Sequence, residues 1–107
     1  MMKMIAMSAS DADVKHIALF YALQKPAAAK TPSKGNAAAG KTASAACAGC
    51  HGEQGVSTNP ANPSLAGQDA QHSAAAMDAY KKRTRSEETM KLAATGLSDA
   101  EIADLAA

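Results

Sequence analysis

Two cysteines and a histidine are the residues whose types and spacing could do chemistry in this sequence. Cys47 and Cys50 are three positions apart, and His51 follows directly. At the end of a helix, two thiols at this spacing can reach the two vinyl groups of one porphyrin and form thioethers. The imidazole of His51 then lies under the iron as its proximal ligand. This Cys-x-x-Cys-His motif is the attachment signature of c-type haem, so we expect covalent haem c at these three residues.

The same residues leave two other interpretations open. A redox-active cysteine pair of the thioredoxin type would follow a strand and usually stand beside an aromatic residue, whereas the neighbours here are alanine and glycine. A zinc site would need two further ligands at a suitable spacing. His16 and His72 are available, but each is isolated in the sequence. The histidine directly after the second cysteine favours haem over both.

The composition also favours a large cofactor. The chain has 107 residues, enough for one small domain, and aromatic residues make up 3% of it. Much of the 47% hydrophobic content is alanine, which buries little area per residue. A domain of this size and composition has a thin core, which an apolar prosthetic group would complete.

The charges are nearly balanced but unevenly placed. A net charge of +1, from 11 basic and 10 acidic residues, argues against a general nucleic-acid-binding protein. Basic residues gather in two stretches, Lys25, Lys30, Lys34 and Lys41 in one and Lys81, Lys82, Arg83 and Arg85 in the other. Each stretch is either a solvated surface or a docking rim for an acidic partner. No apolar run has the length of a membrane-spanning helix.

Helical periodicity and helix breakers predict an all-α chain. We expect helices over residues 10–24, 36–46 and 68–83, and a last helix that opens at Ser98. Ser10 or Asp11 is the expected N-cap of the first helix, and Asp69 lies near the start of the third. The glycine- and proline-containing stretches between them are expected as a linker after Gln24 and as loops over residues 52–67 and 86–89.

The two ends of the chain repeat each other. Residues 2–14 align with residues 90–102 at a constant offset, so that Met2 stands opposite Met90 and Ser10 opposite Ser98. Repeats of this kind indicate tandem domains. We therefore expect a fragment of a two-domain protein. Residues 1–24 would be the C-terminal end of a preceding domain, 25–35 a linker, and 36–107 the next domain, truncated in its last helix.

Segments around the haem motif are similar to those of the class I cytochromes c, and in particular of the dihaem cytochrome c4 family. These segments are residues 35–41, 47–52, 57–60, 63–68 and 96–107. The resemblance covers residues 35–107, while residues 1–24 resemble the end of a preceding cytochrome c domain. It implies a small cytochrome c-type helical domain wrapped around a covalently bound haem.

The resemblance also implies roles for residues outside the motif. Met90 stands where the family places its distal methionine, which makes His51 and Met90 the two axial ligands of the iron. Pro63 stands where a backbone carbonyl accepts the N–H of the proximal imidazole, a bond that orients the ring. Met2 matches the distal methionine of the preceding unit. His72 is the rival distal ligand, and it would give a lower potential.

Two departures from the family pattern concern helix packing. His72 and Ser73 stand where the family usually has Tyr-Leu, which weakens an apolar contact with the haem edge. The last helix lacks the aromatic pair that normally packs against the first helix of the domain. Residues 10–24 carry the same pattern with Phe20 and Tyr21, so they could fold back into the slot left by the truncated last helix and give a permuted domain.

A haem iron with histidine and methionine ligands has no open coordination position, which favours electron transfer over bond-making chemistry. We expect a carrier and not an enzyme, shuttling single electrons between respiratory redox partners such as a terminal oxidase or reductase. The alternatives are an electron-entry domain of a larger oxidoreductase complex and a haem enzyme or sensor that frees a coordination position. Thioether attachment takes place outside the cytoplasm in bacteria, so we expect the periplasm, with any membrane association through partners.

Overall fold

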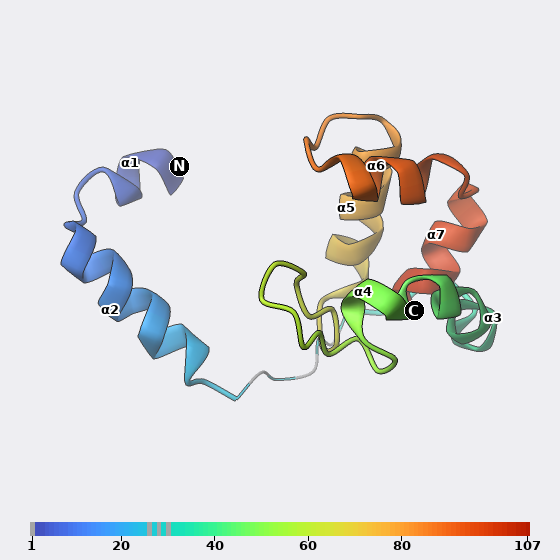
Figure 1. The fold of residues 1–107 in the computed structure, drawn as a ribbon, viewed down its shortest axis with the longest axis horizontal. Helices are drawn as coiled ribbons and strands as arrows, with labels where there is room; N and C mark the ends of the chain where they lie inside the picture. The colour runs from blue at the N-terminus through green and yellow to red at the C-terminus, as the bar shows by residue number, and fades with distance from the viewer. Residues whose placement is uncertain (1, 26, 28, 30) are drawn as a thin grey trace.

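The computed structural model describes residues 2–25, 27, 29 and 31–107, and this part of the chain contains helices and no strands. The helices are α1 (Met2–Ala6), α2 (Asp11–Ala22), α3 (Ala37–Ala43), the 3-10 helix η1 (Ser44–Ala46), α4 (Ala48–His51), α5 (Ala70–Lys81), α6 (Glu88–Thr95) and α7 (Asp99–Ala106). The all-α fold class predicted from the sequence is confirmed. Figure 1 shows α1 and α2 apart from a second group formed by α3 to α7.

Helix α7 connects the beginning and the end of the second group, because it packs against both α3 and α5. Its contact with α3 and the preceding turn leaves no room for a side chain at two positions. A Cβ atom on Gly40 would lie 1.9 Å from the carbonyl oxygen of Asp104, and one on Gly35 would lie 2.0 Å from that of Ala103. The N–H of Asn36 also donates to the Asp104 carboxylate at 2.7 Å. Glycine therefore allows the two backbones to touch.

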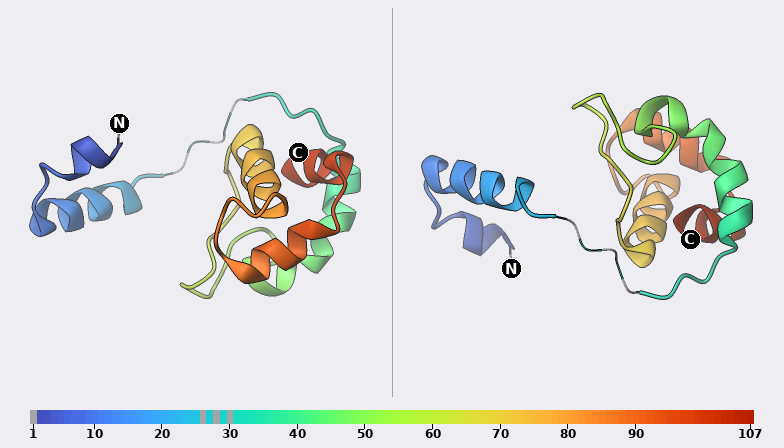
Figure 2. Two further views of the ribbon diagram at one scale, coloured as in Figure 1. Left: turned by 90° about the horizontal axis from the view of Figure 1, so that it is seen from above. Right: turned by 90° about the horizontal axis from the view of Figure 1, so that it is seen from below.

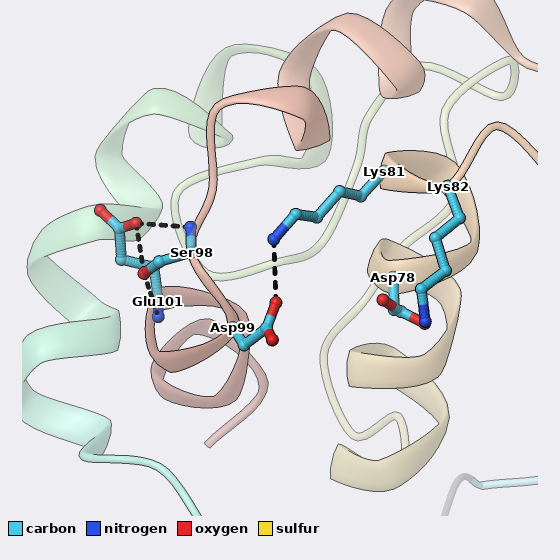
Figure 3. A network of polar contacts seen from close by, with 6 residues as sticks. All are labelled: Asp78, Lys81, Lys82, Ser98, Asp99 and Glu101. Atoms are coloured by element: carbon cyan, nitrogen blue, oxygen red, sulfur yellow. Dashed lines mark hydrogen bonds and ion pairs between the residues drawn. The ribbon is translucent and has the colours of Figure 1, made fainter.

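Helix α5 is fastened to its neighbours at both ends. At its C-terminal end, Lys81 forms an ion pair of 2.8 Å with Asp99 at the start of α7 (Figure 3). At the other end, Asp69 is the N-cap and accepts from the N–H of His72 at 3.0 Å, which confirms the predicted helix start. The hydroxyl of Thr31 donates to the same carboxylate. These contacts hold α5 against α7 and against the segment that precedes α3.

Helices α1 and α2 leave their apolar side chains exposed, and none of their described residues is buried. On α2, Val14 is 51% exposed, Ile17 52% and Phe20 59%. Both views in Figure 2 place these helices away from α3 and α7. The alternative in which residues 10–24 occupy the slot of the last helix is therefore not the arrangement of this structure, in which α7 itself packs on α3.

The sequence repeat between the chain ends is also a repeat of local structure. Ser10 caps α2 and Ser98 caps α7, and each forms a capping box with the acidic residue three positions later, Asp13 or Glu101. The backbone angles of the two caps agree, with φ −72° and ψ 162° at Ser10 and φ −73° and ψ 163° at Ser98. The repeated serine and acid thus start the same kind of helix twice.

Several elements differ from the sequence predictions. The predicted helices do not include α1, α4 or α6, since these helices are short and lack a long apolar period, and α6 begins inside the loop predicted over residues 86–89. The helix predicted over residues 36–46 ends at Ala43 and continues as a 3-10 turn. There the hydroxyl of Ser44 donates to the carbonyl of Lys41 at 2.9 Å, a local bond that competes with regular helix pairing.

The C-terminal end of α5 holds an arginine in the left-handed backbone region. Arg83 has φ 60°, and within the described residues it is the one non-glycine residue with positive φ. Its N–H donates to the carbonyl of Tyr80 at 2.9 Å, and the N–H of Thr84 donates to that of Ala79 at 2.8 Å. This pair of bonds ends helices in a Schellman motif, where glycine is the usual residue. An L-residue in this conformation costs about 1–2 kcal/mol.

We expect Gly40→Ala to lower the free energy of unfolding of the haem-loaded protein by about 1–3 kcal/mol, because the added methyl group forces α3 and α7 apart. Chemical denaturation followed by circular dichroism measures this loss. Gly96→Ala is the matched control, since a Cβ atom there meets nothing within 4 Å and φ is −84°. Equal losses in the two variants would contradict the close helix contact.

Acid is expected to weaken the start of α7. The pKa of Glu101 lies below its ordinary value, first because the N–H of Ser98 donates to its carboxylate and then because the Ser98 hydroxyl does. The unfolded chain, with a glutamate pKa of about 4.3, binds the proton more readily, so this stabilisation is present above that pH and is lost as the pH falls through the folded pKa. Denaturation at several pH values between about 5 and 3 measures the loss.

Glu101→Gln should make stability depend less on pH over that range, because the amide does not titrate. Glu53→Gln is the control, since Glu53 is an exposed loop residue with no ion pair in the described part of the chain. A pH dependence that is the same in the native protein and in Glu101→Gln would show that the capping box does not contribute.

Candidate functional site

Helix α4 and the turn before it hold the three predicted attachment residues. The N–H groups of Cys50 and His51 donate to the carbonyl of Cys47 at 3.2 and 3.0 Å, so the three residues share one helical turn. Side chains three positions apart on a helix lie on the same side of it. Both thiols are free, with Cys47 half-buried and Cys50 exposed. The structure thus brings both sulfur atoms and the imidazole together on one short element.

The imidazole of His51 is buried, with 7% of the residue exposed. Its Nδ1 atom lies 2.8 Å from the carbonyl oxygen of Pro63. Because a carbonyl oxygen can only accept, Nδ1 carries the proton and donates it. In the neutral form of the ring Nε2 then carries the lone pair, and imidazole binds metals through such a nitrogen. The contact with Pro63 therefore fixes both the orientation of the ring and its tautomer.

The loop between α4 and α5 positions the Pro63 carbonyl. The loop begins at Gly52, the C-cap of α4, which has a φ of 83°. A Cβ atom added at this position would lie 2.1 Å from the carbonyl oxygen of Val56. Two side chains of the loop then reach back to α4. The hydroxyl of Ser57 and the amide of Asn62 each donate to the carbonyl of Cys50 at 3.1 Å. The residue that binds His51 thus directly follows one that binds Cys50.

Sequence reasoning did not assign this anchoring role to Ser57 and Asn62. The available signal is compositional, because loops rich in serine, asparagine and proline often bond their side chains to nearby backbone groups. It does not say which carbonyl accepts. The structure shows that both side chains donate to the same acceptor, the carbonyl of Cys50 in α4.

Met90 is the third residue of α6 and is half-buried. Its N–H donates to the carboxylate of Glu87, the N-cap of the helix, at 2.7 Å. The N–H groups of Met90 and Thr89 hold the pKa of Glu87 below its ordinary value. In Figure 1, α6 lies on the opposite side of the domain from α4. The backbone at Met90 is therefore fixed by its cap, on an element that faces the attachment helix across the domain.

The two other histidines lie elsewhere. His16 is exposed on α2, and His72 is exposed in the first turn of α5. Among the residues that the structure describes, no three or more His, Cys, Asp or Glu side chains gather in a way that could hold a metal ion. The donor set at α4, two free thiols on one turn beside an imidazole with Nε2 available, fits haem c.

Comparisons with known proteins agree with this donor set. The model of the cytochrome c family matches residues 37–107. Cytochrome c-554(548) of Halomonas halodenitrificans is 40% identical over 76 residues, which cover 68% of this chain and 92% of that protein. Cytochrome c4 of Pseudomonas aeruginosa is 41% identical over 73 residues, which cover 68% of this chain and 36% of that protein. Among solved structures, cytochrome c4 of Acidithiobacillus ferrooxidans superposes with a TM-score of 0.83 at 25% identity, covering 95% of this chain and 64% of that one.

This chain belongs to the cytochrome c family. Within that family it is a class I c-type cytochrome near cytochrome c4, as the sequence analysis predicted. Its cofactor is covalently bound haem c, and Cys47 and Cys50 fit the attachment motif. The chain spans 36% and 41% of the lengths of the two curated cytochromes c4 that it matches. None of the helices in the described residues combines the length and apolar character needed to cross a bilayer.

We expect Asn62→Ala to lower the free energy of unfolding by about 1 kcal/mol, because the carbonyl of Cys50 loses one of its two side-chain donors. Denaturation of the haem-loaded protein measures the loss. Gln71→Ala, at an exposed position of α5, is the control. Equal stability of Asn62→Ala and the native protein would show that the loop is held by other contacts.

Proposed function

We propose that this chain carries single electrons through a haem attached at Cys47 and Cys50, with His51 and Met90 as axial ligands. The observation that carries this proposal is the 2.8 Å contact between Nδ1 of His51 and the carbonyl oxygen of Pro63, which directs the other ring nitrogen, Nε2, to serve as the metal-binding atom of the neutral ring. When bound, haem c supplies an iron that gains or loses one electron. The family membership of the chain supports electron transfer as its general role.

The residues of the chain contribute in three ways. Cys47 and Cys50 anchor the porphyrin covalently, so that it does not depend on the small core for retention. The buried His51 is held in one orientation by Pro63, which strengthens it as a donor and limits rearrangement between oxidation states. The thioether of Met90 is a soft and neutral ligand, which favours reduced iron and raises the potential. Ligands on both sides leave no position for a substrate, which supports a carrier over an enzyme.

We also propose that α1 and α2 are the counterparts of α6 and α7 in a second cytochrome c unit. The matching capping boxes at Ser10 and Ser98 support this assignment. So does the superposition on a cytochrome c4, which extends over 95% of this chain. Residues 1–24 would then end one unit, 25–35 would link the units and 36–107 would form the next one. Met2 takes the place of Met90 in the first unit.

The partners that fit this role are redox proteins, such as a terminal oxidase or reductase, in the bacterial periplasm, where thioether attachment is completed. The second candidate function is that of an electron-entry domain within a larger oxidoreductase complex. The exposed apolar side chains of α1 and α2 are compatible with it, because a larger complex would cover them, as would the rest of a preceding cytochrome c unit. The two functions share the haem site and differ in what lies beside it.

Two measurements on the full chain, expressed with haem-maturation machinery, test the proposed carrier. The pyridine haemochrome spectrum reports thioether-linked haem, and a potentiometric titration reports the number of electrons exchanged. We expect a haem c spectrum and a reversible one-electron transition. A colourless protein with both thiols still titratable would refute the proposal. So would rapid binding of carbon monoxide by the reduced protein, because it requires an open coordination position.

We expect Met90→Leu to abolish the near-infrared sulfur-to-iron band of the oxidised protein. Loss of the thioether should also lower the midpoint potential by about 0.1 V or more, within the roughly 0.8 V range that axial ligands span. Met77→Leu is the matched control, since Met77 is a half-buried methionine on α5. A band that persists in Met90→Leu, or disappears in Met77→Leu, would contradict ligation by Met90.

A further inference from the structure

The connection between α5 and α6, residues 82–87, carries the second basic stretch of the sequence. All of its residues are exposed. It ends at Glu87, the N-cap of the helix that holds Met90 three positions later. We call residues 82–87 the α5–α6 loop. Its position next to α6 makes it a surface close in sequence to the proposed distal ligand.

Three lysines in and near this loop already have carboxylate partners within the chain. Lys81 pairs with Asp99 and Lys82 pairs with Asp78, each at 2.8 Å. Figure 3 shows Lys81 directed from α5 to the start of α7 and Lys82 folded back along α5. Further along, Lys91 pairs with Glu88 at 2.5 Å. A partner's carboxylate would have to compete with these carboxylates of the chain for each lysine.

The two arginines of the loop differ from these lysines. Within the described residues, no carboxylate lies within ion-pair distance of Arg83 or Arg85. The guanidinium of Arg85 lies 4.7 Å from the centre of the Tyr80 ring, a contact that steadies its plane without neutralising it. Guanidinium groups bind carboxylates in a bidentate fashion, which a lysine cannot do. Two free guanidinium groups thus stand at the loop.

Arg83 keeps an unfavourable backbone conformation at this place. Its φ of 60° belongs to the position at which a Schellman motif usually has glycine. The side chain of Arg83 makes no hydrogen bond or ion pair in the described part of the structure that would offset the cost. Backbone strain that stability does not explain is found preferentially where a residue has a functional task.

We propose that Arg83 and Arg85 form the docking surface for a redox partner that presents clustered carboxylates. This inference rests on the proposed electron-carrier function and specifies the partner of that function. The two arginines hold the partner by paired N–H to carboxylate contacts beside α6. One electron then passes between the haem of this chain and the partner's acceptor, with no bond made or broken and no proton transferred. Attraction between the loop and the carboxylates speeds encounter at low salt.

The test uses the haem-loaded full chain and two small oxidants of opposite charge, hexacyanoferrate(III) and tris(phenanthroline)cobalt(III). The variants are Arg83→Gly, Arg85→Gln and the double variant, with Arg83→Lys to restore the charge. Lys41→Gln is the control, because it removes an exposed cation on α3. Oxidation of the reduced protein is followed by stopped flow at ionic strengths of about 0.01 M and about 1 M, where the Debye length is about 30 Å and about 3 Å.

At low ionic strength we expect oxidation by hexacyanoferrate to slow about threefold in each arginine variant and about tenfold in the double variant. The rate with the cationic oxidant should stay the same or rise, and at high ionic strength the differences should vanish. Arg83→Lys should recover most of the rate. Unchanged rates in the double variant, or an equal loss in Lys41→Gln, would overturn the proposal.

Two further readouts separate docking from folding and from the chemistry of the haem. Arg83→Gly should raise the melting temperature by about 4–8 °C, since glycine removes the backbone cost, and yet slow the reaction. A glutamate oligomer should shift the backbone amide resonances of residues 82–87 in the native protein and not in the double variant. Resonance shifts elsewhere would overturn the docking surface. Failure of the carrier function would appear instead as absence of a one-electron transition in every variant.

Discussion

One nitrogen of the His51 imidazole is hydrogen-bonded to the carbonyl of Pro63. This bond constrains the loop that carries Pro63, the attachment helix that carries His51, and the nitrogen through which the ring can bind iron. The bond selects the tautomer that can bind iron, so a change at either end would alter the ligand itself. It also requires that residues twelve positions apart approach closely. The hydrogen bonds from Ser57 and Asn62 to the carbonyl of Cys50 hold the loop against α4 and so keep Pro63 close to His51. A small domain thereby keeps a buried imidazole in place with backbone carbonyls and loop side chains.

The sequence predicts those features that depend on neighbouring residues. The haem motif, a helix start at Ser10 or Asp11, another near Asp69 and the all-α class follow from local spacing. The structure and comparisons confirm the class and the cofactor, and the structure identifies Ser10 and Asp69 as the N-caps. Features that depend on distant residues escape. No local sequence pattern predicts that the carbonyl of Cys50 accepts hydrogen bonds from two side chains, or that the residues around Met90 form the helix α6. The axial role of Met90 is a prediction for the same reason, since it depends on how two helices face each other.

Net charge says little about the surface of this domain. The value of +1 hides a division between cations that are paired and cations that are not. Ion pairs with carboxylates of α5, α6 and α7 are formed by Lys81, Lys82 and Lys91, while the two loop arginines form none among the described residues. The basic stretch around residues 81–85 therefore contains two kinds of cation, lysines with an ion-pair partner and arginines without one. The paired lysines stabilise single helices or, in the case of Lys81, join α5 to α7, whereas the two arginines have no carboxylate partner among the described residues.

Contact between α3 and α7 places the first helix and the last described helix of residues 36–107 side by side. Gly40 is what permits that proximity, because its missing side chain lets the two backbones meet. Units whose first and last helices lie next to each other can follow one another along a chain through a short linker. Gene duplication could therefore string such units along one chain, each keeping its own haem pocket. The matching capping boxes at Ser10 and Ser98 are what such a duplication would produce.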